Sequence, residues 1–145
     1  VVLLKLGSLM MDVKLIQLGQ SVLKKFVGQI RGYPASSSVL LEAVNFALGR
    51  RQEIVIAGDY QQQQTQQMLA TVREHFLPNA VLLLHQDGPD GEAIEEVAGF
   101  LKQQKALEGR PTAYVCEEYV CNKPVQDVEQ LQGMLSRIAA SGRRT

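Results

Sequence analysis

Short apolar runs alternate with helical patterns after residue 50, and this alternation constrains the fold more than any other feature. The runs occupy residues 53–58, 80–85 and 112–116. Short, nearly continuous apolar runs of this kind are typical of strands buried on both faces of a parallel sheet. Strands that alternate with helices predict βα units with right-handed crossovers. We therefore expect three βα units over residues 50–145.

An amphipathic helix follows each run. The first helix covers about 63–77, and its apolar face comprises Leu69, Val72 and Phe76. The second begins near residue 91, with the apolar residues Ile94, Val97, Ala98 and Leu101. The third begins near residue 128, with the apolar residues Leu131, Met134, Leu135 and Ile138. Asp59 is a suitable N-cap for the first helix, and Asp127 and Gln130 have capping-box spacing at the start of the third.

The first 49 residues have a helical period instead. Apolar residues recur in steps of three and four over 15–30 and again over 39–48, with a break at Gly32-Tyr33-Pro34. Ser36, Ser37 or Ser38 is suited to cap the second of these helices, and residues 1–10 predict a further one. The predicted fold class is α/β: an N-terminal helical hairpin, residues 1–49, followed by a small three-stranded parallel βα sheet, residues 50–145.

Composition narrows the classes of partner. The chain has 145 residues, of which 46% are hydrophobic and 21% charged, as in globular proteins. Its 15 basic and 15 acidic residues cancel, so no net field attracts nucleic acid, and the terminal Arg143-Arg144 is interpreted as solvated charge. Lys5, Asp12 and Lys14 interrupt the apolar start, which excludes a membrane span there. We expect no nucleic-acid partner and no membrane partner.

The start of the chain and its two cysteines bear on its cellular location and on whether an upstream part is missing. Two cysteines do not make a disulfide scaffold, and no signal-peptide pattern is present, so a reducing, cytoplasmic location is expected. The chain begins at Val1 with a helical pattern already under way. This suggests that an upstream part is missing, although processing is an alternative.

Polar residues follow each predicted strand. Ligands of open parallel sheets bind outside the carboxyl ends of the strands. That rule predicts a shared ligand edge at the ends of the three strands, formed by Asp59, Tyr60, His85, Asp87 and Glu117. Polar residues at strand ends are also ordinary in α/β domains, so a solvated edge is the competing interpretation.

Cys116 and Cys121 are the most specific feature of that set. Four residues separate them, too many for a Cys-x-x-Cys motif, and no second cysteine pair accompanies them. Three interpretations remain open: two reduced packing residues, a reversible disulfide that closes a short loop, or half of a metal site.

Established cofactor and nucleophile motifs do not occur. The sequence contains no dinucleotide-binding turn, P-loop or nucleophile elbow, so no cofactor or metal is predicted and no catalytic residue is assigned. His75, within the first predicted helix after the boundary, is interpreted as a surface or capping group.

Several motifs in order resemble one family. They are residues 45–49, 53–59, 76–79 and 109–117, with Cys121 and Pro124-Val125. Together they resemble the C-terminal region of the spermatogenesis-associated, thioredoxin-domain-containing proteins, from about Gly19 to Leu135. The resemblance implies a parent protein with an N-terminal thioredoxin-like domain, a central six-hairpin α/α toroid similar to carbohydrate-active enzymes, and an α/β end like this chain.

The resemblance implies that residues 1–49 are the end of the toroid. The expected function is then a C-terminal structural and interaction module without a complete active site, in a parent of carbohydrate-related or redox character. Its expected partners are the remaining domains of the parent chain and, through exposed helical faces, further copies of itself. The alternative is a small redox or ligand-binding α/β module that uses the loop between Cys116 and Cys121.

Overall fold

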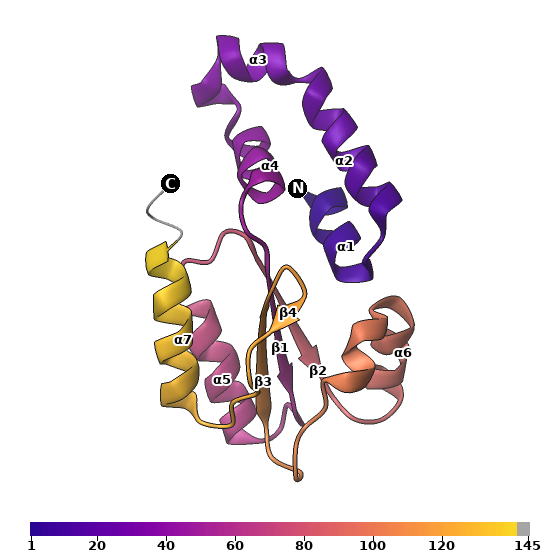
Figure 1. Cartoon of the computed structure of the whole chain (residues 1–145), viewed down its shortest axis with the longest axis vertical. Helices are drawn as coiled ribbons and strands as arrows, with labels where there is room; N and C mark the ends of the chain where they lie inside the picture. Colours follow the sequence, from indigo (N-terminus) through magenta and orange to yellow (C-terminus); the bar gives the residue numbers. More distant parts are fainter. Residues whose placement is uncertain (142–145) are drawn as a thin grey trace. The chain divides into compact units, whose positions relative to one another are not determined.

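The computed structural model describes residues 1–141 and divides the chain into two compact units (Figure 1). The first runs from Val1 to Arg51 and is helical, and the second begins at Gln52 and contains a sheet. In the described part of the chain, no helix has the length and apolar character needed to cross a membrane.

The helical unit contains four α-helices and one 3₁₀ turn: α1 (Val2–Met10), α2 (Val13–Lys25), α3 (Val27–Gly32), η1 (Pro34–Ser36) and α4 (Ser38–Leu48). The Asp12 carboxylate caps α2 by accepting the N–H groups of Lys14 and Leu15. Phe26 leaves helical geometry, with φ −98° and ψ 5°, and so divides the pattern of residues 15–30 into α2 and α3. Val27 and Gly28 are weak helix formers, which favours a break at this point. The predicted helix in residues 1–10 is confirmed.

Glycines allow α1 and α2 to pack closely. A Cβ on Gly19 would lie 2.9 Å from the Leu4 side chain, and a Cβ on Gly7 would lie 2.8 Å from that of Ile16. Leu4 is buried, as are Ala43 and Phe46 of α4. An ion pair of 3.2 Å between Lys5 and Glu42 also joins α1 to α4.

The second unit has a four-stranded mixed sheet in the order β2-β1-β3-β4. Its elements are β1 (Gln52–Ala57), α5 (Gln63–Arg73), β2 (Ala80–His85), α6 (Pro89–Val97), η2 (Gly99–Gln103), β3 (Thr112–Glu117), β4 (Val120–Cys121) and α7 (Val128–Ser141). Strand β1 pairs in parallel with β2, with Ile54 opposite Leu82. It pairs antiparallel with β3, with Ile54 opposite Val115.

The prediction of a three-stranded parallel sheet was therefore wrong in the direction of β3 and in missing β4. The connection after β2 explains the difference. Helix α6 ends at Val97, η2 follows, and the loop up to Pro111 contains a tight turn with positive φ at Glu108 and Gly109. This path returns the chain to the end of the sheet at which β2 finished, because Thr112 lies opposite Ala57.

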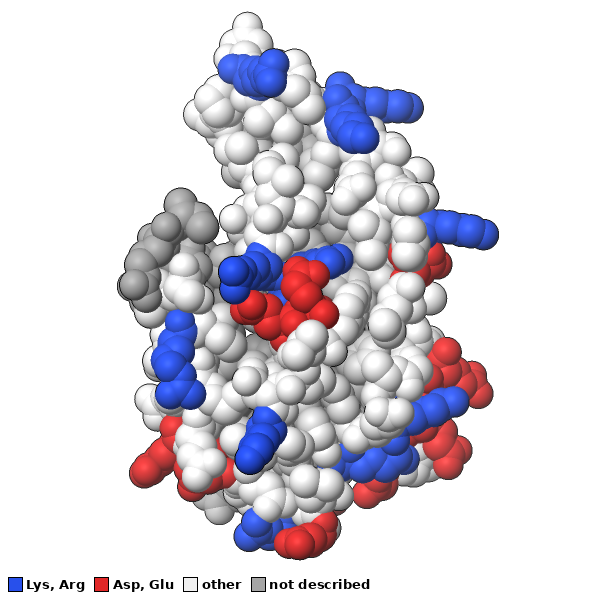
Figure 2. All heavy atoms as spheres, viewed as in Figure 1, with Lys and Arg blue, Asp and Glu red and all other residues white. Residues whose placement is uncertain are grey.

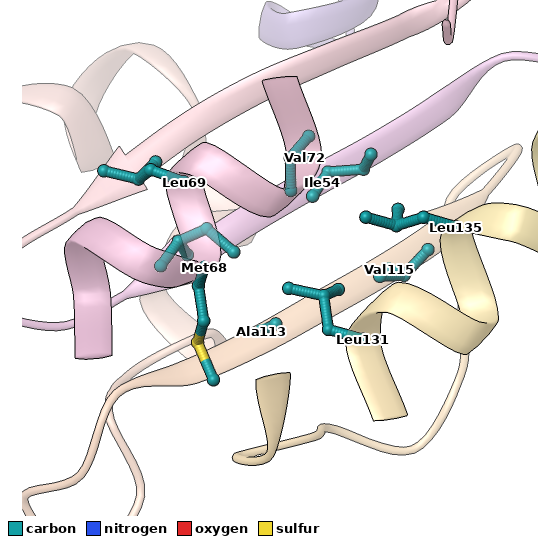
Figure 3. Close-up of a cluster of buried hydrophobic side chains, with 9 residues drawn as sticks. Ile54, Met68, Leu69, Val72, Ala113, Val115, Leu131 and Leu135 are labelled. Carbon is teal, nitrogen blue, oxygen red and sulfur yellow. The ribbon is translucent and has the colours of Figure 1, made fainter. Parts of the chain in front are cut away.

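Two apolar layers cover the sheet. On one face α5 and α7 pack over β1 and β3 (Figure 3), and the buried residues there are Ile54, Ile56, Met68, Leu69, Val72, Ala113, Val115, Leu131 and Leu135. On the other face Val55, Ala57 and Tyr114 pack against Ala98 and Leu101 of the α6–η2 segment. Strands β1 and β3 are thus buried on both faces, as the apolar runs predicted, whereas β2 is partly buried and β4 is exposed.

Helix ends agree with the sequence only in part. Asp127 accepts the N–H of Gln130 at 2.8 Å, so the predicted cap of α7 is confirmed. Asp59 does not cap α5: it accepts the N–H of Gln61, and α5 begins only after Gln62. Helix α5 also ends at Arg73, which leaves Phe76 beyond its apolar face and 80% exposed.

Two further expectations about helix ends have definite outcomes. Ser37 precedes α4 at the N-cap position, but its hydroxyl donates to the carbonyl of Tyr33 at 2.9 Å and does not cap the helix. The Nδ1 of His75 lies 2.8 Å from the carbonyl oxygen of Thr71, at the end of α5. A capping role for His75 is therefore confirmed.

The terminal Arg143-Arg144 lies outside the described residues.

Candidate functional site

The ends of β1 and β2 bring four of the candidate residues to one edge. The N–H of Gly58 donates to the carbonyl of His85 at 2.9 Å, which joins the segment containing Asp59 and Tyr60 to the segment containing Asp87. The N–H of Tyr60 donates to Gln86 Oε1 at 2.9 Å. A backbone contact and the Gln86 side chain thus join the two strand ends that carry Asp59, Tyr60 and Asp87.

Glu117 does not join this edge. It lies opposite Gln52 in the antiparallel pairing, at the start of β1, whereas Asp59 follows the end of β1. The expected single ligand edge with all five residues is therefore wrong, because β3 runs in the opposite direction. Cys116, opposite Glu53, also lies toward that other end.

His85 turns away from solvent and takes part in a buried polar network. Its Nδ1 lies 2.7 Å from the carbonyl oxygen of Gln104, and its Nε2 lies 3.0 Å from Glu95 Oε1. Both ring nitrogens of His85 thus have a polar partner inside the fold. With a relative exposure of 3%, His85 is placed to hold α6 and η2 on the sheet and is closed to a ligand at the edge.

Charges around Glu95 shift the ionisation of this network. The Lys105 ammonium, 2.9 Å from Glu95 Oε1, and the neighbouring His85 together hold the pKa of the Glu95 carboxyl below its usual value, against the effect of burial. The same contact raises the pKa of Lys105. Burial raises the pKa of the Tyr114 hydroxyl, which donates to the carbonyl of Lys105 at 2.6 Å.

Cys116 and Cys121 form a disulfide across the β3–β4 hairpin. The two strands are joined by Glu118 and Tyr119, which both have positive φ, of 49° and 65°. Two consecutive residues of positive φ are what a two-residue type I′ hairpin turn requires, and glycine or asparagine is usual there. The loop that the sequence predicted after the third strand is therefore a covalently closed hairpin.

Gln104 is the residue at this site that the sequence did not indicate. Its Nε2 donates to Cys116 Sγ at 3.5 Å and to Cys121 Sγ at 3.4 Å, and its carbonyl contacts His85. It lies in a polar stretch after η2, where a glutamine carries no sequence signal of burial. Its position follows from the α6–η2 path and so depends on the tertiary fold.

Open polar hollows lie elsewhere, between the first turns of α5 and α7. Two of them share Gln64 and Asp127, and Arg110 and Gln126 line the second. None of the candidate residues borders either hollow. Within residues 1–141, no group of three or more His, Cys, Asp or Glu side chains is arranged to hold a metal ion.

The fold and site define a mixed α/β unit with a disulfide-closed hairpin, preceded in sequence by a helical unit. No family model and no solved structure matches the chain. Curated relatives do: it is 31% identical to spermatogenesis-associated protein 20 of Homo sapiens over 114 residues, which is 79% of this chain and 14% of that protein. The Rattus norvegicus and Mus musculus proteins of the same name are 29% and 28% identical over the same length.

Over 79% of its length the chain is thus similar to the spermatogenesis-associated proteins that its motifs indicate. It spans about 14% of the length of the curated relatives that it matches.

Proposed function

We propose that this chain is a structural and interaction module, whose helical unit docks on another part of a larger protein. One observation carries the proposal: large apolar side chains remain exposed along the helices of the first unit. Helix α2 alone exposes Leu18 and Val22, with Phe26 following at its end, all in steps of four residues. Residues in such steps share one face of a helix.

The exposed face has few charges. Among the helices of this unit, α2 buries only Gly19, although its sequence is strongly amphipathic. Helix α4 exposes Val39, Leu41 and, at 83%, Leu48. Figure 2 shows a mostly uncharged surface where these helices lie, with isolated Lys and Arg side chains. Exposed large apolar side chains that share a helix face mark a candidate interaction site.

We propose that an adjoining part of the parent chain covers this exposed apolar face. The curated relatives are several times longer than the region that they share with this chain, so their other parts are available to cover such a face. The resemblance to proteins with an α/α toroid supports the same occupant, since the last helices of a toroid pack on their neighbours. Chemistry of the parent, whether carbohydrate-related or redox, would then belong to its other domains.

The exposed face predicts how the chain behaves alone. We expect it to bind a hydrophobic dye and to associate with rising concentration, because apolar surface is removed from water in both processes. The triple variant Leu18→Gln, Val22→Gln and Phe26→Gln should lose most of both effects. Phe76→Gln, which removes one exposed aromatic ring from the other unit, is the matched control and should change little.

Dye fluorescence and sedimentation velocity, each over a wide concentration range, measure these effects. A chain that stays monomeric and binds no dye would contradict the proposal. A single discrete dimer, unchanged when the remainder of the parent is added, would replace the proposed occupant by a second copy.

A further inference from the structure

The Cys116–Cys121 disulfide joins one buried and one exposed residue. Cys116 lies in β3 with a relative exposure of 2%, whereas Cys121 lies on the edge strand β4 and is exposed. An incoming thiolate must approach a disulfide sulfur directly, and access decides which sulfur is attacked. The geometry therefore directs attack to Cys121 and makes Cys116 the leaving group.

Gln104 is arranged to receive that leaving group. Its Nε2 already contacts both sulfurs, at 3.5 Å for Cys116 and 3.4 Å for Cys121. A thiolate that forms on Cys116 would thus meet an N–H donor in a buried site, since Gln104 is only 7% exposed. Hydrogen bonds to an ionised group are stronger than neutral ones, so this contact strengthens as the bond opens.

The other atom of the same amide favours the reduced form. Gln104 Oε1 is buried and has no hydrogen-bond partner among the described residues. A disulfide has no hydrogen to donate, whereas a thiol is a weak donor. Reduction therefore creates a donor beside an amide whose acceptor is left unsatisfied in the oxidised form. Stabilising the reduced form makes a disulfide easier to reduce.

The turn between the strands acts in the same direction. Glu118 and Tyr119 both hold positive φ without being glycine or asparagine. Such conformations carry a cost that the surrounding structure must offset. Opening the disulfide removes one of the constraints that hold this turn.

We infer that Cys116–Cys121 is a thiol–disulfide exchange site whose substrate is a dithiol, with Gln104 as a positioning residue. One thiolate of the dithiol attacks Cys121 Sγ, the Cys116–Cys121 bond breaks, and its electron pair leaves on Cys116. The second thiolate then attacks the sulfur of the first in the mixed disulfide, and Cys121 leaves. The protein gains two electrons and two protons, and the dithiol loses the same number and becomes a disulfide.

The whole chain can be tested in anaerobic mixtures of reduced and oxidised dithiothreitol, and separately of reduced and oxidised glutathione. Thiols are trapped by alkylation and counted by mass spectrometry, while circular dichroism monitors the fold. We expect reversible reduction with an unchanged spectrum. If the bond resists both buffers under native conditions, or if reduction and loss of the fold coincide, the disulfide is a structural staple and the inference is wrong.

Two pairs of variants test the roles of the residues. Gln104→Met should require a reduced-to-oxidised ratio about tenfold higher for half reduction, the effect of roughly one hydrogen bond. Gln103→Met, a change at the exposed neighbour, should leave the ratio unchanged. An equal response of both variants would show that Gln104 does not favour the reduced form.

The second pair compares the cysteines. Cys116→Ala leaves the exposed thiol, and Cys121→Ala leaves the buried one. The first variant should react with an aromatic disulfide reagent at least about tenfold faster, because a buried thiol must wait for local opening. Equal rates would contradict the assigned order of attack.

Discussion

At the scale of single residues, local hydrogen bonding was predictable in part and buried polar contacts were not predictable. The cap at Asp127 follows from spacing along one helix, whereas the caps expected at Asp59 and at the serines before α4 do not form. The burial of His85 and its contact with Gln104 join segments separated by an irregular path, so sequence spacing does not reveal them. Of the four candidate residues at the ends of β1 and β2, Asp59, Tyr60 and Asp87 are exposed there, whereas the ring of His85 points into the interior.

Glu95 gives this network a pH dependence with a definite sign. Its folded-state pKa is lowered, first by the hydrogen bond from Lys105 and then by His85. A carboxyl with a lowered pKa stabilises the fold above its unfolded pKa, near 4.5, and that contribution is lost as the pH falls through the lower folded-state value. The Glu95→Gln variant should therefore be less stable than the unsubstituted chain at pH 7. This difference in the free energy of unfolding should shrink toward pH 3.

Urea unfolding at a series of pH values between these limits measures the difference. Glu96→Gln, on the exposed side of the same helix, is the matched control. A difference that stays constant over the whole range would show that Glu95 acts through packing and not through its charge.

At the scale of elements, the positions of strands were readable and their directions were not. The three apolar runs match β1, β2 and β3 closely, since burial on both faces leaves a continuous apolar signature. Direction depends on where the connecting segment returns the chain, and α6 and η2 carry no pattern that distinguishes a crossover from a return. The two-residue strand β4 is too short to give a periodic signal.

The start of α6 shows how closely its connection packs. A Cβ on Gly91 would overlap the carbonyl oxygen of Gln86, a backbone atom that cannot move aside alone. Gly91→Ala should therefore destabilise the chain by about 1–3 kcal/mol, as overpacking does. Gly133→Ala is the matched control, because its Cβ would meet nothing within 4 Å in α7, and it should stabilise the chain by about 0.5–1 kcal/mol.

Thermal unfolding of the two glycine variants and of the unsubstituted chain measures both effects. If Gly91→Ala were neutral, the tight approach between α6 and the end of β2 would not describe the protein in solution.

At the scale of the whole molecule, the change of pattern at Arg50-Arg51-Gln52 and the boundary between the compact units lie close together. The apolar stripe of α2 predicted a helix with one covered face, and in the described chain that face stays largely exposed. A sequence pattern specifies that a face is apolar, whereas what covers it is decided by other parts of an assembly. The proposed docking on the parent chain resolves this difference.

The most direct test is to produce this chain and the remainder of its parent protein as separate tagged polypeptides, mix them, and measure co-elution by size-exclusion chromatography. We expect a stable complex that abolishes dye binding. The triple variant at Leu18, Val22 and Phe26 should prevent the complex from forming, whereas Phe76→Gln should not. No complex, or a complex that the triple variant leaves intact, would contradict the proposed docking.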